Sequence, residues 1–409
     1  MILLLCGFGL SQLAGSSEVH PKITWKKCTK AGCSSQSGGI VIDSEWREIV
    51  DANGKKCMTD SQSWDSSVCS GPADCSQKCY LQGYKYSDAG VSTTGDAVRL
   101  KFVTPTGIGS RVYLFDETAG TYVNFKVLNK EFTFDIDTSQ VPCAVNGALY
   151  FSEMDPDGGK SRFPNNKAGA KYGTGYCDAQ CPRDGKFIGN NANFRRQYGS
   201  CCFEWDIWEG NVGATQMAAH PCSATVNTPA AVCESNCNQC DTAGCAWNPY
   251  KVESNMGKGH TYYGKGQQVD PTKKITVVTQ FKTADGTDLG QLKEVRRLYV
   301  QGGKVIPNNK KIQNDKPFDS IGDDCCQNGS SGDAAYVTRG GDKAFTTSFR
   351  RGAVLAMSIW TDGSMGWLNS GDAGPCGNPS GGKDGLAKQY PNAYVEFSNI
   401  RFGDIDSTY

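Results

Sequence analysis

Short stretches of alternating apolar and polar residues, separated by turn-forming residues, restrict this 409-residue chain to an all-β fold. A period of two directs one set of side chains into a core and the other toward solvent or a cleft. Strands are predicted at residues 98–102, 274–281, 354–360, 394–397 and 398–402, with Gly/Asn/Asp/Ser clusters such as 189–191 between them. No sustained helical periodicity interrupts this pattern, which favours a sandwich of two antiparallel sheets.

Twenty cysteines indicate a fold held together by disulfides in an oxidising compartment. The alternative is a set of metal sites, which would require Cys-x-x-Cys pairs or clusters of cysteine and histidine. The only Cys-x-x-Cys here, Cys237 to Cys240, lies among irregularly spaced cysteines. Disulfides are therefore favoured, and we expect no metal and no cofactor.

The first residues form an apolar run, 1–10, which leads to the small residues Ala14-Gly15-Ser16. This pattern predicts a signal peptide over residues 1–16, although no basic residue precedes the run and its start is atypical or truncated. A membrane span needs about 20 apolar residues, so we expect a secreted, extracellular protein without a membrane partner. Removal of the peptide takes Cys6 with it and leaves an odd number of cysteines, so one thiol should lack an intramolecular partner.

The rest of the chain, residues 17–409, is expected to form one domain. No Pro/Ser/Thr-rich linker divides it, and a strand-like segment near the C-terminus leaves no room for a carbohydrate-binding module. Lys plus Arg equals Asp plus Glu at 42 each, so the chain has no net electrostatic field that would attract nucleic acid, and a neutral substrate is expected. A monomer is expected as well. The sequon at Asn328 predicts N-glycosylation, which fits secretion.

Residues 201–209 concentrate cysteines, tryptophans and carboxylates in one predicted strand. Alternation divides its side chains between the core, which receives Phe203, Trp205 and Ile207, and a cleft, which receives Glu204, Asp206 and Trp208. Glycoside hydrolysis requires two carboxyl groups at the anomeric carbon, one protonated and one ionised. The segment therefore predicts a glycosidase.

Glu209 does not follow this alternation, because strict parity would direct it into the core beside Ile207. A bulge near Trp208 would turn it back to the cleft, and bulges are common beside active sites. On strand statistics alone, an ordinary solvated charge at a strand end would be favoured instead.

Cys201 and Cys202 point to opposite faces of the predicted strand and should form disulfides with different partners, for which Cys177 and Cys181 are candidates.

Four segments closely resemble glycoside hydrolase family 7, the secreted cellulases of fungi and protists: residues 146–150, 168–182, 204–209 and 220–222. The resemblance extends from about residue 18 to residue 403. It implies a concanavalin-like β-sandwich, or jelly roll, with a long cleft and a β-1,4-glucan as the partner. It also implies Glu204 as the nucleophile, Asp206 as its tuning neighbour and Glu209 as the proton donor and acid/base.

These roles are chemically coherent. Glu204 must be ionised while Glu209 starts protonated, and two close carboxyl groups separate their titrations. Asp206, on the same face, is expected to share a proton or hydrogen bond with Glu204. Configuration is retained if the two glutamate carboxyls stand roughly 5–5.5 Å apart.

The resemblance also implies a disulfide framework and a set of substrate contacts. The implied pairs are Cys28-Cys33, Cys57-Cys79, Cys69-Cys75, Cys143-Cys376, Cys177-Cys202, Cys181-Cys201, Cys222-Cys240, Cys233-Cys237, and Cys245 with Cys325 or Cys326. The implied glucose platforms are Trp46, Trp360 and Trp367. The positions expected to bond sugar hydroxyls or the nucleophile are Asn146, Tyr150, Asp178 and Gln180, with His220 on the leaving-group side.

Most tryptophans and histidines are packed structural residues, which is the alternative interpretation of each of these. Trp360 shares a strand face with the small residues Ala356 and Ser358, which favours a platform. The remaining tryptophans are expected to be structural, and Trp208 has no assigned role; the structural set is Trp25, Trp64, Trp205 and Trp247.

Loop lengths distinguish the two activities of the family. The segment between Trp367 and Tyr394, the stretch 222–245 and the loop before Ser200 are short, and Glu48 stands where cellobiohydrolases carry a second tryptophan. These features predict an open cleft and an endo-β-1,4-glucanase. The alternatives are a cellobiohydrolase with reduced loops and, in a different class, a catalytically silent glucan-binding lectin.

Overall fold

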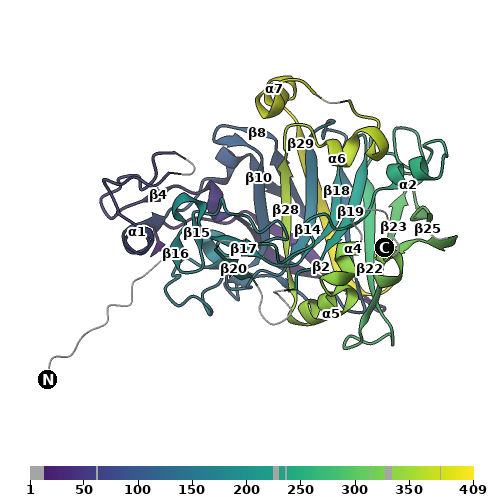
Figure 1. Ribbon diagram of the computed structural model, residues 1–409, viewed down its shortest axis with the longest axis horizontal. Helices are drawn as coiled ribbons and strands as arrows, with labels where there is room; N and C mark the ends of the chain where they lie inside the picture. Colours follow the sequence, from purple (N-terminus) through teal and green to yellow (C-terminus); the bar gives the residue numbers. More distant parts are fainter. Residues whose placement is uncertain are drawn as a thin grey trace.

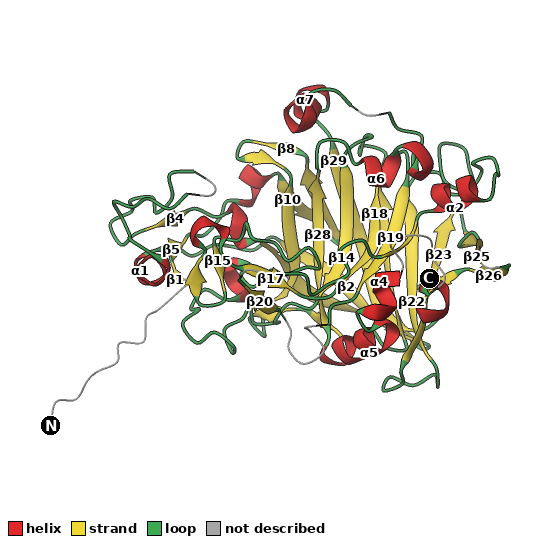
Figure 2. Ribbon diagram, viewed as in Figure 1, coloured by secondary structure: helices red, strands yellow, loops and turns green. Residues whose placement is uncertain are grey.

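A computed structural model describes residues 13–60, 63–223, 230–234, 237–313, 315–327, 334–377 and 379–409. Its centre is a mostly antiparallel sheet of 18 strands that curls into two layers (Figures 1 and 2). The front layer runs, in spatial order, through β3 (Gly32–Ile42), β10 (Ser110–Asp116), β28 (Ala353–Trp360), β14 (Asn146–Ser152), β18 (Glu204–Gly210), β19 (Thr215–His220) and β21 (Cys245–Trp247). The predicted all-β sandwich is confirmed.

The back layer packs behind this one and is joined to it at one edge. It runs through β6 (Val91–Thr94), β7 (Ala97–Lys101), β29 (Tyr394–Asp404), β13 (Lys130–Asp137), β22 (Ile275–Thr283) and β23 (Leu292–Gln301), which pairs with both β24 (Lys304–Pro307) and β27 (Ser320–Ile321). The joining strand is β2 (Lys22–Thr29), antiparallel to β3 and parallel to β29. The layers are therefore one continuous hydrogen-bonded sheet.

Shorter elements surround the sandwich (Figure 2). The remaining strands are β1 (Leu13–Ala14), β4 (Ile49–Val50), β5 (Tyr80–Leu81), β8 (Val103–Thr104), β9 (Gly107–Ile108), β11 (Thr121–Tyr122), β12 (Asn124–Phe125), β15 (Phe187–Ile188), β16 (Asn191–Ala192), β17 (Gly199–Cys201), β20 (Ala231–Cys233), β25 (Lys311–Gln313) and β26 (Lys316–Phe318). The α-helices are α1 (Pro72–Lys78), α2 (Pro249–Asn255), α3 (Asp323–Cys326), α4 (Ala334–Thr338), α5 (Gly341–Arg351), α6 (Gly366–Asn369) and α7 (Gly382–Gln389). In the described residues, no helix is long and apolar enough to cross a membrane.

Aromatic side chains from both layers meet in the core. Phe151 of β14 packs edge-on against Phe132 of β13, with ring centres 5.1 Å apart. Trp205 of β18 contacts Phe281 of β22 in the same way at 5.7 Å. The apolar face of β18 is thus buried against the back layer, which holds that strand in place.

The predicted strands at 98–102, 274–281 and 354–360 correspond to β7, β22 and β28, and 394–397 and 398–402 form the single strand β29. The predicted strand at 201–209 is divided into β17 and β18, because Cys202 and Phe203 leave the ladder. Helix α5 was not expected. Its buried Phe345 and Phe349, four residues apart, contact Phe203 and close one end of the core.

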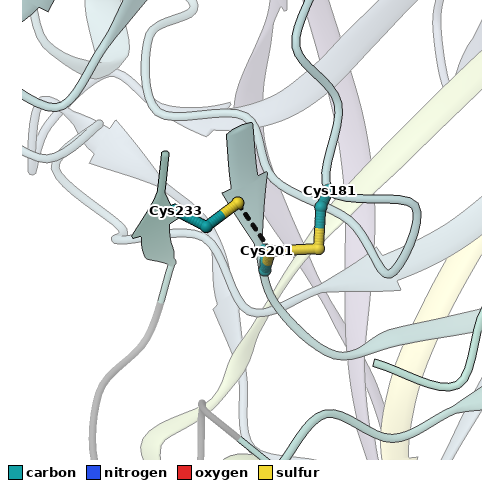
Figure 3. A group of neighbouring side chains, drawn as sticks. All are labelled: Cys181, Cys201 and Cys233. Atoms are coloured by element: carbon teal, nitrogen blue, oxygen red, sulfur yellow. Dashed lines mark hydrogen bonds between the residues drawn. A yellow bond between two sulfur atoms is a disulfide. The ribbon is translucent and has the colours of Figure 1, made fainter. Parts of the chain in front are cut away.

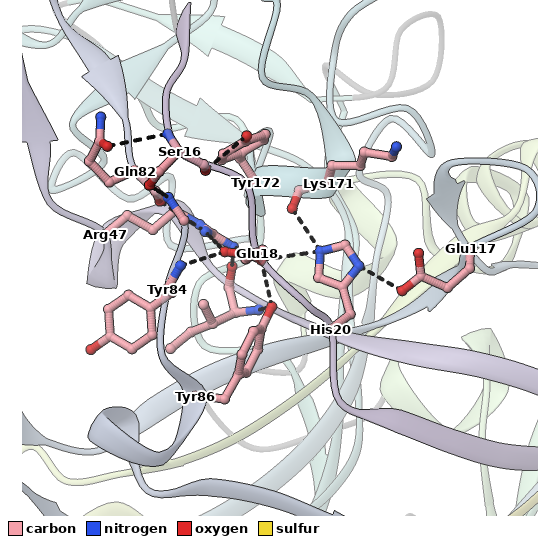
Figure 4. A network of polar contacts seen from close by, with 12 residues as sticks. Ser16, Glu18, His20, Arg47, Gln82, Tyr84, Tyr86, Glu117, Lys171 and Tyr172 are labelled. Carbon is pink, nitrogen blue, oxygen red and sulfur yellow. Dashed lines mark hydrogen bonds and ion pairs between the residues drawn. The ribbon is translucent and has the colours of Figure 1, made fainter.

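A buried carboxylate anchors the beginning of the described chain to the sandwich (Figure 4). Glu18 accepts hydrogen bonds from both terminal nitrogens of Arg47, from the Tyr84 amide at 2.6 Å and from the Tyr86 hydroxyl at 2.8 Å. His20 Nε2 lies 3.1 Å away. Burial opposes ionisation, but the hydrogen bonds of Arg47 and His20 outweigh it and lower the pKa of Glu18 to about 2.

The last residues of the predicted signal peptide contact the domain. Leu13 and Ala14 form β1, which pairs in parallel with β5. The Gly15 amide donates to the Leu81 carbonyl, and the Tyr172 hydroxyl donates to the Ser16 carbonyl. Residues 1–12 lie outside the described part of the chain.

The disulfides have the pairing that the resemblance implied, and Cys245 is bonded to Cys326. Cys325 is buried and belongs to no disulfide. The sulfur of Cys233 lies 3.5 Å from that of Cys201. Figure 3 shows this pair beside the disulfide of Cys201 with Cys181. Cys233 is bonded to Cys237, so this sulfur cluster consists of disulfides and offers no thiolate to a metal ion. The sequon at Asn328 lies outside the described residues.

Candidate active site

A bulge in β18 brings its three carboxyl groups to one face of the front layer. Glu204 is opposite Ser152, Asp206 opposite Tyr150 and Glu209 opposite Ala148, which are alternate positions of β14. The register shifts between Leu149 and Tyr150 on this side and between Asp206 and Glu209 on the β19 side. One extra residue thus reverses the parity of Glu209, as expected from the sequence.

The bulge also decides the place of Trp208, which alternation had directed to the cleft. Trp208 is fully buried in the core, where it packs near Tyr263 and Tyr299. The cleft prediction for Trp208 is therefore wrong. The reason is that Ile207 and Trp208 both lie on the core side of the bulge, between Asp206 and Glu209.

Small side chains form the floor in front of the carboxyl groups. Ala148 of β14 is opposite Ser358 of β28, and Tyr150 is opposite Ala356. The hollow above this floor has a volume of about 240 Å³. Its lining includes the predicted residues Trp46, Tyr150, Asp178, Gln180, Glu204, Asp206, Glu209 and Trp360.

Glu209 lies in a buried environment with hydrogen-bond donors. Asn146 Nδ2 donates to Glu209 Oε1 at 2.9 Å, and Asn146 Oδ1 accepts from the Gly210 amide at 2.9 Å. Burial and the charge of Asp206 raise the pKa of Glu209 well above its usual value, against His220, Asn146 and Gln216. Asn146, expected near the substrate, is fully buried and holds the carboxyl group.

Asp206 is paired with His220 rather than with Glu204. His220 Nε2 lies 3.0 Å from Asp206 Oδ2, and His220 Nδ1 lies 2.8 Å from the Asp241 carbonyl. Burial disfavours the charged imidazole, but the hydrogen bond and charge of Asp206 prevail and raise the pKa of His220 to about 9. Both ring nitrogens thus lie at hydrogen-bond distance from protein atoms, and His220 is the charge partner of Asp206. Its expected place on the leaving-group side remains a prediction.

A backbone amide of the segment that carries Asp178 binds the Glu204 carboxyl group. The Ala179 amide donates to Glu204 Oε2 at 3.2 Å. Burial and the charges of Asp206, Asp178 and Glu209 raise the pKa of Glu204 well above its usual value. Burial and the charge of Asp206 raise both pKa values, and the charge of Glu209 raises that of Glu204 further, so both carboxyl groups keep their protons to higher pH than free glutamates do.

Two residues of the cleft, Arg111 and Tyr176, were not predicted from the sequence. The Arg111 guanidinium stacks 3.3 Å from the ring centre of Tyr176 and pairs with Asp43 at 2.9 Å. The Tyr176 hydroxyl lies 2.9 Å from that of Tyr150 and donates to Asp178 Oδ2 at 2.7 Å. Arg111, directly before the buried residues 112–115 of β10, was the available signal, since a charge at such a position faces a polar cleft or a partner.

The predicted platform tryptophans differ in their placement. Trp46 and Trp360 line the hollow, and Trp46 Nε1 donates to the Gly109 carbonyl at 3.0 Å. Trp367 stacks on Trp360 with ring centres 6.3 Å apart and donates from Nε1 to Asp362. Trp360 and Trp367 are 37% and 44% exposed, so their rings form a continuous aromatic surface open to solvent.

Comparison with known proteins identifies the family. The family model of glycosyl hydrolase family 7 matches residues 14–409. The chain belongs to glycosyl hydrolase family 7. Family 7 enzymes are cellulases, and the all-β architecture of this one is that of its solved relatives.

Solved structures of both activities of family 7 are similar to this enzyme. A cellobiohydrolase from Daphnia pulex is 37% identical, with a TM-score of 0.90 over 98% of this chain and 100% of its own. An endocellulase from Humicola insolens is 37% identical, with a TM-score of 0.86 and the same coverage. An endoglucanase I complexed with cellobiose is 38% identical, with a TM-score of 0.86 over 98% of this chain and 100% of its own.

Proposed function

We propose that this family 7 enzyme is a secreted, retaining endo-β-1,4-glucanase that acts as a monomer through a single catalytic domain. The observation that carries the proposal is the row of Glu204, Asp206 and Glu209 on one face of β18, at a hollow lined by Trp46 and Trp360. Two carboxyl groups beside an aromatic surface are what hydrolysis of a β-glucan requires. The disulfide framework supports secretion.

The proposed reaction is a double displacement. Glu204 attacks the anomeric carbon while Glu209 gives its proton to the departing glycosidic oxygen, which leaves a glycosyl ester on Glu204. Glu209, now ionised, takes a proton from water, and that water releases the sugar with its original configuration. The Ala179 amide favours ionised Glu204, and the buried environment of Glu209 favours its initial protonated form.

Two side chains supply the nucleophile and the proton in this scheme, so the reaction draws on no metal or cofactor. The substrate would stack on Trp46 and Trp360 and exchange hydrogen bonds with Tyr150, Asp178 and Gln180, which line the hollow. Trp367 extends the aromatic surface beyond Trp360.

Solvent exposure of the platform rings supports an open cleft and internal cleavage. Trp360 and Trp367 keep more than a third of their surface exposed, whereas a roofed tunnel would cover them. Glu48 is also exposed and pairs with Lys56 at 2.6 Å. Processive release of cellobiose is the second candidate, because the Daphnia pulex cellobiohydrolase has a TM-score of 0.90 to this chain.

The loss of viscosity of carboxymethylcellulose, measured against reducing ends released, tests the proposal. Wild type is expected to thin the solution steeply per reducing end, and Glu204→Gln to lower kcat by about a thousandfold or more. Glu396→Gln, a glutamate of the back layer, is the matched control and should retain activity. Slow thinning with accumulating cellobiose would transfer the assignment to a cellobiohydrolase. Glucan binding without hydrolysis by folded wild type would indicate a lectin.

A further inference from the structure

A buried arginine lies behind the catalytic strand, and the proposed reaction does not use it. Arg297 of β23 is 1% exposed and faces Thr279 of β22 in the back layer. Its Nε donates to Thr279 Oγ1 at 3.3 Å. Its Nη2 donates across the core to the backbone carbonyl of Ile207, inside β18. One guanidinium therefore links the back layer to the catalytic strand.

The charge of Arg297 is not balanced by a carboxylate within the part of the chain that the structure describes. Its partners there are Thr279, Ile207 and Tyr299, whose ring centre is 5.6 Å from the guanidinium carbon. Burial lowers the pKa of Arg297, and only tyrosines oppose that effect. Arg47, equally buried, has the carboxylate of Glu18 beside it. An unpaired buried cation is costly, so its presence calls for a use.

Ile207 is the residue that the bulge removes from both neighbouring ladders. β14 pairs with Asp206 and Trp208 and skips Ile207. β19 pairs with Asp206 and Glu209 and skips both Ile207 and Trp208, so only Ile207 lacks a partner on both sides. A bulged residue loses its ladder partner, and a buried carbonyl without a partner destabilises the conformation that buries it. Arg297 supplies that partner with a charge-assisted hydrogen bond, the stronger kind.

We propose that Arg297 is a positioning residue for Glu209. By holding the Ile207 carbonyl in the core, its guanidinium maintains the bulge that turns Glu209 to the cleft face. Without this hydrogen bond, β18 relaxes toward regular alternation, in which Glu209 has the parity of Ile207 and faces the core. The inference rests on the proposed role of Glu209 as acid/base.

The test compares two substrates that differ in their need for a proton. Phenyl β-cellobioside requires protonation of its leaving oxygen, whereas dinitrophenyl β-cellobioside does not. Arg297→Met is expected to lower kcat/KM for the phenyl substrate about a hundredfold, because a small misplacement of a catalytic group has this effect. The loss on the dinitrophenyl substrate should be about threefold or less, since acid catalysis is not needed there. Arg297→Lys, which keeps a charged donor, should restore part of the phenyl rate.

Arg296→Met is the matched control, because Arg296 directly precedes Arg297 on β23, faces the other way and pairs with Glu294. It should leave both rates unchanged. Equal losses on both substrates in folded Arg297→Met would overturn the inference and assign Arg297 to stability alone. If Arg297→Met does not fold, Arg297→Lys carries the test, and unfolding of both variants would likewise overturn it.

Glu209→Gln, measured on the same pair of substrates, separates this inference from the proposed mechanism. Selective loss on the phenyl substrate in Glu209→Gln but not in Arg297→Met would reject only the positioning role. Absence of selectivity in Glu209→Gln would reject Glu209 as the acid, whatever the arginine variants do.

Discussion

At the scale of single residues, the three carboxyl groups of β18 are distinguished by the partners that each receives from other strands. Asn146 of β14 donates to Glu209, His220 of β19 pairs with Asp206, and the Ala179 amide donates to Glu204. Each carboxyl group has its own charge environment as a result. The same three side chains in an isolated strand would titrate almost alike.

Replacement of His220 is expected to move the alkaline limb of activity. In His220→Gln the imidazolium beside Asp206 is lost, and its charge no longer favours ionised Glu209. The pKa of Glu209 rises further, so Glu209 keeps its proton to higher pH, and the alkaline limb of kcat/KM should move upward by about one pH unit. We expect kcat to fall about tenfold as Asp206 loses its partner. The pH profile on an aryl cellobioside measures both effects.

His260→Gln is the control for this substitution, because His260 stacks on Tyr250 outside the catalytic row. Its profile should match that of wild type. An alkaline limb that stays in place, or moves to lower pH, in His220→Gln would contradict the charge partnership of His220 and Asp206.

At the scale of elements, disulfides hold the segment before β18 against the segment that carries Asp178. Cys177 is bonded to Cys202 and Cys181 to Cys201, on either side of Asp178 and Ala179. The amide that reaches Glu204 belongs to this stapled segment. The geometry of Glu204, the proposed nucleophile, therefore depends on covalent links as well as on the sheet.

Removal of the first of these links is expected to lower both stability and activity. Cys177→Ala with Cys202→Ala opens a loop with a sequence separation of 25. Chain entropy gives a loss of about 3.5 kcal/mol in the free energy of unfolding. The segment that carries the Ala179 amide is then less firmly held, which should lower kcat several-fold. Denaturant unfolding and hydrolysis of carboxymethylcellulose measure the two effects.

The pair Cys28→Ala with Cys33→Ala is the control, because this disulfide bridges the hairpin of β2 and β3 with a separation of 5. About 2 kcal/mol should be lost there with no change in kcat. Equal kcat values in the two double variants would show that activity does not depend on the disulfide between Cys177 and Cys202.

At the scale of the whole molecule, buried glutamates fasten both ends of the described chain to the sandwich. Glu131 of β13 accepts hydrogen bonds from the amides of Asp406, Ser407 and Thr408. Glu18 joins the other end to Arg47. The closure of the fold depends on pH through Glu18, whose pKa is lowered to about 2.

Glu18→Gln is expected to destabilise the protein at neutral pH and to matter less in acid. A carboxyl group whose pKa falls from 4.5 to about 2 on folding contributes stability that is fully present above 4.5. That stability, about 3 kcal/mol, is lost as pH falls from 4.5 toward 2. The difference in Tm between wild type and Glu18→Gln should therefore be largest near pH 6 and shrink toward pH 3.

Glu117→Gln is the control for Glu18→Gln, because Glu117 also contacts His20 but is 48% exposed at its side chain. Its Tm should follow that of wild type within about one degree. A Tm difference for Glu18→Gln that is constant across this pH range would show that burial of the side chain, rather than its charge, provides the stability.

The sequence by itself determined the fold class and the strand that carries the row of carboxyl groups. Alternation specified β7, β22 and β28, because a side-chain period of two follows from strand geometry alone. It also showed that Glu209 needed a bulge to face the cleft. Helix α5 was not predicted, because its large apolar residues, Phe345 and Phe349, are too few to give a periodic signal.

The tertiary structure decided which partners these residues receive. Trp208 follows the alternation of a cleft residue and yet lies in the core, His220 is paired with Asp206, and Arg297 meets the carbonyl of Ile207. Each outcome depends on residues far apart in the sequence that come together when the layers close. A local pattern records the conformation of one strand, whereas partners across a core follow from packing.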